Sequence, residues 1–316
     1  MRVLYAGSGE IGIPTLQSLL SSKDHQCIGV LTQPDRPTGR GKVLQAGKIK
    51  QLAEASKIPV FQPEKASSEE SVQPLMKLEA EVMIVFAYGQ ILKKNLLDLP
   101  PRGCFNLHAS LLPRYRGASC LQAAILNGDE ETGLTLMKMA EGLDTGDICL
   151  QSKLTISDQE TAGSLHDRVA ELGPDLLEKG LNQLTHGQLE MQPQEEALAT
   201  YAPKLSKQDG LIDWQQSAGQ ISRHIRAMSP WPGAFSYIDD GRASSATRYV
   251  IHPPVYAQSG QDDQPCGLIM QQEENRFAVQ TGEGLLQVSR LQKQGKKAMD
   301  VSDFMRGNDV LGKIFG

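Results

Sequence analysis

Short apolar runs alternate with stretches of helical spacing through the first half of the chain, and this alternation constrains the fold most. The strand-like runs are bounded by turn residues, and they are Val3–Ala6, Cys27–Thr32, Val82–Ala87, Cys104–Leu107 and Leu134–Met139. The helical stretches are Pro14–Leu20, Lys48–Ser56, Ser68–Leu78, Ser119–Leu126 and Ser164–Gly173. Ser68 and Ser164 are the expected N-caps. This order predicts a mostly parallel, doubly wound α/β sheet, which binds ligands beyond the C-terminal ends of its strands.

The second half differs in character and follows a stretch rich in Gln, Glu and Pro. Its strand candidates are separated by Gly-containing turns, and they are Phe235–Ile238, Ala246–Ile251, Leu268–Gln271, Phe277–Gln280 and Leu285–Leu291. One helix is expected near Ala218–Met228. We therefore expect an α/β domain over residues 1–189, a linker over residues 190–206 and a small β-barrel domain over residues 207–316.

Composition excludes several classes of protein. No apolar run approaches the ~18 to 20 residues that a membrane-spanning helix needs. The segment from Met1 to Gly7 is too short for a signal peptide, and we interpret it as a first strand. Five cysteines, none of them in a CxxC pair, indicate reduced thiols rather than disulfides or a structural zinc site. These features predict a cytoplasmic protein.

Charge is unevenly distributed along the chain. The formal net charge of −5 disfavours general binding to nucleic acid. Residues 33–50, however, contain five basic side chains against the single acid Asp35, and they are Arg36, Arg40, Lys42, Lys48 and Lys50. On charge alone, this cluster fits a solvated face and a site for phosphates equally well.

The turn Gly7-Ser8-Gly9-Glu10-Ile11-Gly12 has the GxGxxG spacing of dinucleotide-binding folds. In those folds an acidic residue at the end of the second strand holds the ribose. Here that strand ends at Thr32-Gln33, and Asp35 comes only after Pro34. Because the basic stretch that follows could hold a 2′-phosphate, an NADP-dependent oxidoreductase remains an alternative. The other interpretation, which we favour, is a tight turn that needs small residues.

Asn106 and His108 end a strand, and their spacing of two places both side chains on one face. A second polar turn, Gly142–Asp147, follows the strand Leu134–Met139 and contains Asp144. An amide and an imidazolium can stabilise an oxyanion during acyl transfer, while a carboxylate orients and charges the histidine. The alternative is structural, with Asn106 at a strand end, His108 in the core and Asp144 in a turn. A Ser-His-Asp hydrolase is disfavoured because Ser110 lies outside any GxSxG motif.

Three segments decide between these alternatives, and they are Asn106–His108, Ser110–Ala118 and Gly142–Asp147. Together they resemble the signature of the folate-dependent formyltransferases. Further segments resemble the branch of that family that acts on charged initiator tRNA, and they are Thr32–Lys42, Thr200–Lys207, Ile212–Trp214, Ile225–Ala234 and Gly295–Met299. The similarity is colinear over nearly the whole chain. It departs from the family pattern at Ser8–Glu10 and at Ser119-Cys120, neither of which includes Asn106, His108 or Asp144.

The resemblance implies a Rossmann-like catalytic domain followed by an OB-like, tRNA-binding β-barrel. It implies transfer of a formyl group from 10-formyltetrahydrofolate, without a metal, to the α-amine of methionine on initiator tRNA. It makes Asn106, His108 and Asp144 catalytic. It assigns Ser110, Leu111, Leu112 and Pro113 to the folate pocket, Tyr88–Leu92 to a wall for the pterin, and Arg36, Arg40 and Lys42 to tRNA contacts. A monomer is expected. A formyltransferase or hydrolase with another acceptor and a non-catalytic tRNA-binding module remain alternatives.

Overall fold

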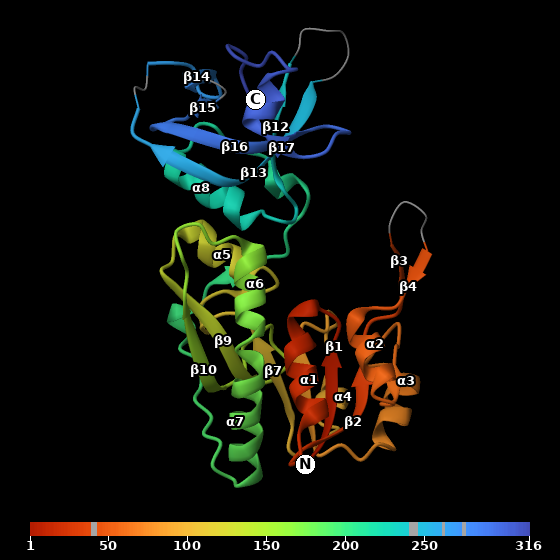
Figure 1. The fold of residues 1–316 in the computed structure, drawn as a ribbon. Coiled ribbons are helices and arrows are strands. Elements are labelled where there is room, and N and C mark those ends of the chain that lie inside the picture. Colours follow the sequence, from red (N-terminus) through yellow and green to blue (C-terminus); the bar gives the residue numbers. More distant parts are fainter. Residues whose placement is uncertain (39–42, 240–245, 261–262, 274–275) are drawn as a thin grey trace. The chain divides into compact units, whose positions relative to one another are not determined.

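The computed structural model describes residues 1–38, 43–239, 246–260, 263–273 and 276–316, and its chain divides into two compact units (Figure 1). The first unit comprises Met1–Cys120, Glu131–Thr155 and His166–Ala202. The second comprises Leu121–Glu130, Ile156–Leu165 and Pro203–Gly316. Each unit is therefore discontinuous in sequence. No helix among the described residues has the length and apolar character that crossing a membrane requires.

A seven-stranded sheet forms the centre of the first unit, in the order β10-β9-β7-β6-β1-β2-β5. Its strands are β1 (Arg2–Gly7), β2 (Gln26–Leu31), β5 (Val60–Phe61), β6 (Val82–Phe86), β7 (Cys104–His108), β9 (Glu131–Lys138) and β10 (Ile148–Thr155). Neighbouring strands in the run β7-β6-β1-β2-β5 pair in parallel, whereas β9 pairs antiparallel with both β7 and β10. The mostly parallel α/β sheet is thus confirmed.

Helices cover both faces of this sheet (Figure 1). Those of the first unit are α1 (Ile13–Ser21), α2 (Lys48–Ala55), α3 (Glu69–Met76), α4 (Lys94–Leu97) and α7 (Gly173–Thr185), and α6 (Ala162–Ala170) belongs partly to it. Leu75 of α3 and Leu96 of α4 share one buried cluster with Leu4 and Met83 of the sheet. Alternation along β1 turns Tyr5 to the opposite face, where its hydroxyl donates to the Gly12 carbonyl at 3.0 Å. Short elements complete the unit, and they are η1 (Glu10–Gly12), β3 (Arg36–Thr38), β4 (Val43–Gln45), β8 (Arg116–Gly117), η2 (Glu196–Leu198) and β11 (Tyr201–Ala202).

One of the two predicted helix caps is confirmed and the other is wrong. Ser68 caps α3, because its hydroxyl accepts from the Ser71 N–H. Ser164 lies inside α6, which begins at Ala162, and its own N–H donates to the Thr161 hydroxyl at 3.1 Å. Thr161, three positions earlier, is also a favoured capping residue, and the apolar period does not distinguish between the two.

A five-strand antiparallel path, β12-β13-β16-β15-β14, forms the second unit, and β17 pairs with β16. These strands are β12 (Ala234–Ile238), β13 (Thr247–Gln258), β14 (Ile269–Glu273), β15 (Arg276–Gln280), β16 (Leu285–Lys293) and β17 (Met299–Asp300). The C-terminal residues join the two edge strands of this path. Gly316 exchanges hydrogen bonds with Tyr237 of β12, and the Phe315 N–H donates at 2.9 Å to the carbonyl of Gly267, which lies just before β14. The sheet therefore closes on itself, as a small barrel does. The remaining elements are α5 (Cys120–Asn127), η3 (Gln208–Gly210), α8 (Ala218–Ala227) and α9 (Val301–Met305).

Candidate active site

The last strand of the parallel part of the sheet, β7, carries two of the candidate catalytic residues. Asn106 and His108 alternate with Phe105 and Leu107, so both lie on the face that Cys104 also occupies. Asn106 is half-buried, and no residue that the structure describes hydrogen-bonds its side-chain amide. That amide is therefore available to a substrate oxygen at the edge of the sheet.

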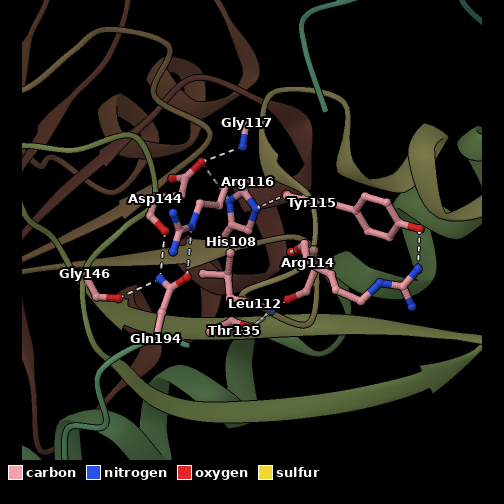
Figure 2. Close-up of polar contacts among 11 residues, drawn as sticks. His108, Leu112, Arg114, Tyr115, Arg116, Gly117, Thr135, Asp144, Gly146 and Gln194 are labelled. Atoms are coloured by element: carbon pink, nitrogen blue, oxygen red, sulfur yellow. Dashed lines mark hydrogen bonds and ion pairs between the residues drawn. The ribbon is translucent and has the colours of Figure 1, made fainter. Parts of the chain in front are cut away.

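His108 is buried, and both of its ring nitrogens face acceptors of the chain (Figure 2). Nδ1 lies 3.6 Å from Oδ2 of Asp144, and Nε2 lies 2.8 Å from the Tyr115 carbonyl oxygen. Because a carbonyl can only accept, Nε2 carries a hydrogen. A second hydrogen on Nδ1 would face the Asp144 carboxylate, so the surroundings favour an imidazolium.

The pKa of His108 reflects competition between burial and nearby acceptors. Burial opposes the charged ring, but the Cys120 sulfur, the Asp144 carboxylate and the Tyr115 carbonyl together raise the His108 pKa to about 9. The imidazolium therefore predominates at neutral pH, and a fixed positive charge lies at the end of β7.

Asp144 lies in the turn that follows β9, and the turn brings its carboxylate to β8 as well as to His108. Its backbone is in the left-handed region with a φ of 52°, which Asp tolerates better than most residues. Oδ2 accepts the Gly117 N–H at 2.8 Å. A Cβ on Gly146 would lie 1.7 Å from the Lys138 carbonyl oxygen, so only glycine fits there. The structure thus brings His108 and Asp144 together at one edge of the sheet.

The predicted folate segment, Ser110 to Pro113, is fixed by hydrogen bonds to other residues of the protein. Ser110 is buried, and its hydroxyl donates to the Arg114 carbonyl at 2.7 Å. Leu112 is also buried, and its backbone bonds the side chains of Thr135 and Gln151. Leu111 and Pro113 are half-exposed, so they are the side chains of this segment that a ligand could reach.

The predicted pterin wall, Tyr88–Leu92, is partly core and partly surface. Tyr88 and Leu92 belong to the same buried cluster as α3. Ile91 is 87% exposed, so it is the apolar side chain of this segment that a ligand could reach.

The glycines of Gly7–Gly12 are explained by packing within the chain. A Cβ on Gly9 would lie 2.8 Å from the Ala87 Cβ, and one on Gly12 would lie 2.3 Å from the Tyr5 hydroxyl. The Ser8 and Gly9 N–H groups both donate to the Ala87 carbonyl, at 3.2 and 3.1 Å. Two of the N–H groups that a pyrophosphate would use in this turn are therefore already bonded. These contacts favour the tight-turn interpretation of the GxGxxG spacing.

The basic cluster of residues 33–50 is partly neutralised by ion pairs. Lys50 contacts Asp35 at 2.6 Å, and Lys48 contacts Glu10 at 2.7 Å. The Lys50 ammonium lowers the pKa of Asp35, so that carboxyl is committed to Lys50 rather than to a ribose. Arg36 is exposed on β3, whereas Arg40 and Lys42 lie outside the described residues.

Arg116 and Gln194, whose roles no sequence pattern predicts, fix the turn that contains Asp144. Arg116 is a fully buried guanidinium on β8, and Gln194 lies in the stretch expected to be a linker. Gln194 bonds the backbone of Asp144 and of Gly146 (Figure 2). The Gln-, Glu- and Pro-rich composition around Gln194 gave no sign of this role.

Comparisons with known proteins agree with this geometry. The chain matches the Formyl transferase family over residues 1–181 and the family described as Formyl transferase, C-terminal domain, over residues 204–309. A methionyl-tRNA formyltransferase of Pseudoalteromonas translucida is 44% identical over 307 residues, which cover 97% of this chain and 94% of that protein. One from Coxiella burnetii is 40% identical over 320 residues, which cover 100% and 99% of the two chains.

Solved structures with low sequence identity share the fold. An N-formyltransferase from Helicobacter canadensis has a TM-score of 0.62 at 18% identity, covering 90% of this chain and 97% of its own. HypX from Aquifex aeolicus, in complex with tetrahydrofolic acid, has a TM-score of 0.61 at 15% identity, covering 96% of this chain and 47% of its own. The matches in sequence extend over both halves of the chain, and the chain therefore belongs to the formyltransferase family and, within it, to the methionyl-tRNA formyltransferases.

Proposed function

We propose that this chain transfers the formyl group of 10-formyltetrahydrofolate to the α-amine of methionine on initiator methionyl-tRNA. The observation that carries the proposal is the contact of buried His108 with half-buried Asp144, together with the available amide of Asn106 on the same face of β7 as His108. Relatives at 40–44% identity, named methionyl-tRNA formyltransferases, support the choice of acceptor.

The residues at the edge of the sheet suit acyl transfer without a covalent enzyme intermediate. When bound, the formyl donor supplies the carbon that the amine attacks, and its N10 leaves with a proton. Asn106 would donate a hydrogen bond to the oxyanion that develops on the formyl group. His108 directs both ring nitrogens at acceptors of the chain, so it would stabilise that oxyanion through its positive charge. Asp144 would keep His108 charged and help to move the proton from the attacking amine towards N10, through water.

The segments around these residues supply candidate binding groups. We propose that folate is held near Ser110, Leu111, Leu112 and Pro113, with Leu111 and Pro113 as the side chains within reach. Ile91, in the segment Tyr88–Leu92, would contact the pterin. We assign Arg36, Arg40 and Lys42 to the tRNA acceptor stem, since Lys48 and Lys50 are engaged by acidic partners. Folate and initiator methionyl-tRNA would be the partners of a cytoplasmic monomer.

The direct test offers the purified chain three acceptors together with 10-formyltetrahydrofolate. These are methionyl-initiator tRNA, methionyl-elongator tRNA and an amino-sugar nucleotide. We expect N-formylmethionine from the initiator tRNA and far less product from the other two acceptors. Formylation of the sugar nucleotide alone would overturn the proposal, and release of formate without any acceptor would indicate a hydrolase.

A further inference from the structure

The Gln194 side chain is hydrogen-bonded at both ends within the turn that carries Asp144. Its Nε2 donates to the Asp144 carbonyl oxygen and to the Gly146 carbonyl oxygen, each at 2.7 Å. Its Oε1 accepts from Nε of Arg116 at 3.1 Å. Both amide hydrogens are therefore directed at the backbone on the two sides of Thr145, and the amide oxygen is held by a fixed cation.

Arg116 is itself fixed by bonds along its whole guanidinium. This group pairs with Glu196, at 3.0 Å from Nη1 and 2.9 Å from Nη2, and Nη1 also donates to the Tyr201 hydroxyl at 3.2 Å. Nε reaches Gln194, as described above. A planar guanidinium bonded at each of its nitrogens has one permitted orientation. Gln194 is thus anchored by a rigid side chain rather than by a mobile one.

The residues on either side of Arg116 contact the catalytic pair directly (Figure 2). The Tyr115 carbonyl accepts from His108, and the Gly117 N–H donates to the Asp144 carboxylate at 2.8 Å. Tyr115 and Gly117 therefore hold His108 and the carboxylate of Asp144, while Gln194 holds the backbone from which Asp144 extends.

From these contacts we infer that Gln194, anchored by Arg116, is a positioning residue that sets the Asp144 carboxylate against His108. The inference rests on the proposed role of the His108–Asp144 pair. Such a device has a physical purpose, because Asp144 has a positive φ in a turn that contains Gly142 and Gly146, and such backbone is intrinsically free to move. Since the His108–Asp144 contact is already 3.6 Å, a further displacement of about 1 Å would break it, and errors of that size can cost ~100-fold in rate.

A purely structural role is the alternative. In that case Gln194 would merely attach residues 190–202 to the first unit, and its removal would lower stability without changing the chemistry of His108. The two roles differ in what happens to His108 in a protein that remains folded.

The experiment compares Gln194→Ala and Gln194→Glu with Gln192→Ala. Gln192 is a matched control because it is exposed, lies two residues earlier and bonds Ile148 through its backbone. Gln194→Glu keeps an oxygen that accepts from Arg116, but it places its second oxygen against the Asp144 and Gly146 carbonyl oxygens, which repel it. This variant should therefore lower activity at least as much as alanine does. We expect kcat to fall by about 10- to 100-fold in both Gln194 variants, KM for the formyl donor and the tRNA to stay within about threefold, and Gln192→Ala to match the wild type.

A second measurement follows the His108 ring directly, by NMR titration of the folded protein without substrate. The groups that face this ring are Asp144, Cys120 and the Tyr115 carbonyl. If Gln194 positions Asp144, then Gln194→Ala will titrate His108 at a lower pH than the wild type does. An unchanged His108 titration, or a kcat within about threefold of wild type, would overturn the inference. If the wild type fails to formylate methionyl-tRNA, the proposed function fails, whereas the titration still decides the role of Gln194.

Discussion

The charge of the His108 ring couples the fold to the proposed chemistry at the scale of a single residue. Its pKa of about 9 in the folded protein lies above the ~6.5 of an unfolded histidine. The folded state therefore holds the proton more tightly. This contribution to the free energy of unfolding is complete below pH ~6.5 and is lost as the pH rises through about 9.

A pH profile of kcat tests this assignment. We expect the wild-type rate to fall on the alkaline side near pH 9, as the imidazolium loses its proton. In Asp144→Asn one of the groups that favour the charged ring is removed while burial still opposes protonation, so the alkaline limb should move to lower pH. Glu141→Gln, in the same turn and exposed, is the control. If the alkaline limb of Asp144→Asn lies at the same pH as that of the wild type, then Asp144 does not influence the protonation of His108.

Alanine substitutions at Asn106, His108 and Asp144 test the three roles together. Each variant should fold, and Asn106→Ala should lower formyl transfer by about 10²- to 10³-fold, the usual loss when one oxyanion donor is removed. His108→Ala and Asp144→Ala should each lower it by a similar factor, because the first removes the charge that stabilises the oxyanion and the second removes a group that supports that charge. Because these residues act as a unit, His108→Ala/Asp144→Ala should be little slower than the slower single variant. The measurement is single-turnover transfer to charged initiator tRNA. A single variant within about threefold of wild type would remove that residue from the mechanism.

At the scale of the element, the success of the sequence-based prediction depends on burial. The apolar run Val82–Phe86 is wholly buried, and β6 matches it closely. The edge strand β10 alternates between half-buried and exposed residues, and the apolar pattern did not reveal it. Residues 192–202, expected as linker, include β11 and the Gln194 contacts. Their bonds depend on residues far away in sequence, which local composition cannot report.

The turn Gly7–Gly12 provides a prediction about the cofactor. If its glycines serve packing against Tyr5 and Ala87, NADPH should not raise the melting temperature. A folate analogue at saturating concentration should raise it, since a ligand at 100 times its Kd adds about 2.7 kcal/mol to the apparent stability. Thermal unfolding with each ligand is the measurement. Stabilisation by micromolar NADPH, with none by folate, would restore the dinucleotide interpretation.

The basic segment after β2 provides a prediction about tRNA. Arg36→Ala, combined with Arg40→Ala and Lys42→Ala, should weaken binding of charged tRNA and leave folate binding intact. The dependence of log affinity on log salt should flatten by up to about one unit for each phosphate that no longer has a basic partner. Lys48→Ala is the matched control, because that ammonium already pairs with Glu10. Equal salt slopes in the triple variant and the wild type would make the segment a solvated face.

At the scale of the whole molecule, the compact units do not correspond to continuous segments of the chain. The sequence predicts continuous domains, because its composition changes once, near residue 190. The compact units instead place Leu121–Glu130 and Ile156–Leu165 with the C-terminal residues. Within that unit, α8 bonds both of these inserted segments. Nε of Arg223 donates to the Leu126 carbonyl at 3.2 Å, and Nη1 of Arg226 donates to the Glu160 carbonyl at 2.9 Å.

This arrangement predicts that residues 203–316 alone are less stable around α8 than the same residues in the intact chain. The fragment lacks the carbonyl that accepts from Arg226, a buried guanidinium, and it lacks the Gly163 N–H that donates to the Ser229 carbonyl at 3.0 Å. A hydrogen bond to a charged group contributes about 1.5–3 kcal/mol, so its loss corresponds to roughly tenfold or more in local opening.

Amide hydrogen exchange, measured on the fragment and on the full chain, can resolve this difference. In the fragment, amides of α8 should exchange at least about ten times faster. Amides of β15 and β16 should change less than those of α8, because the paired strands of both lie within residues 203–316. Equal protection of α8 in the two proteins would mean that the C-terminal residues form a self-sufficient domain. In that case the contacts to Leu126 and Glu160 would contribute no stability.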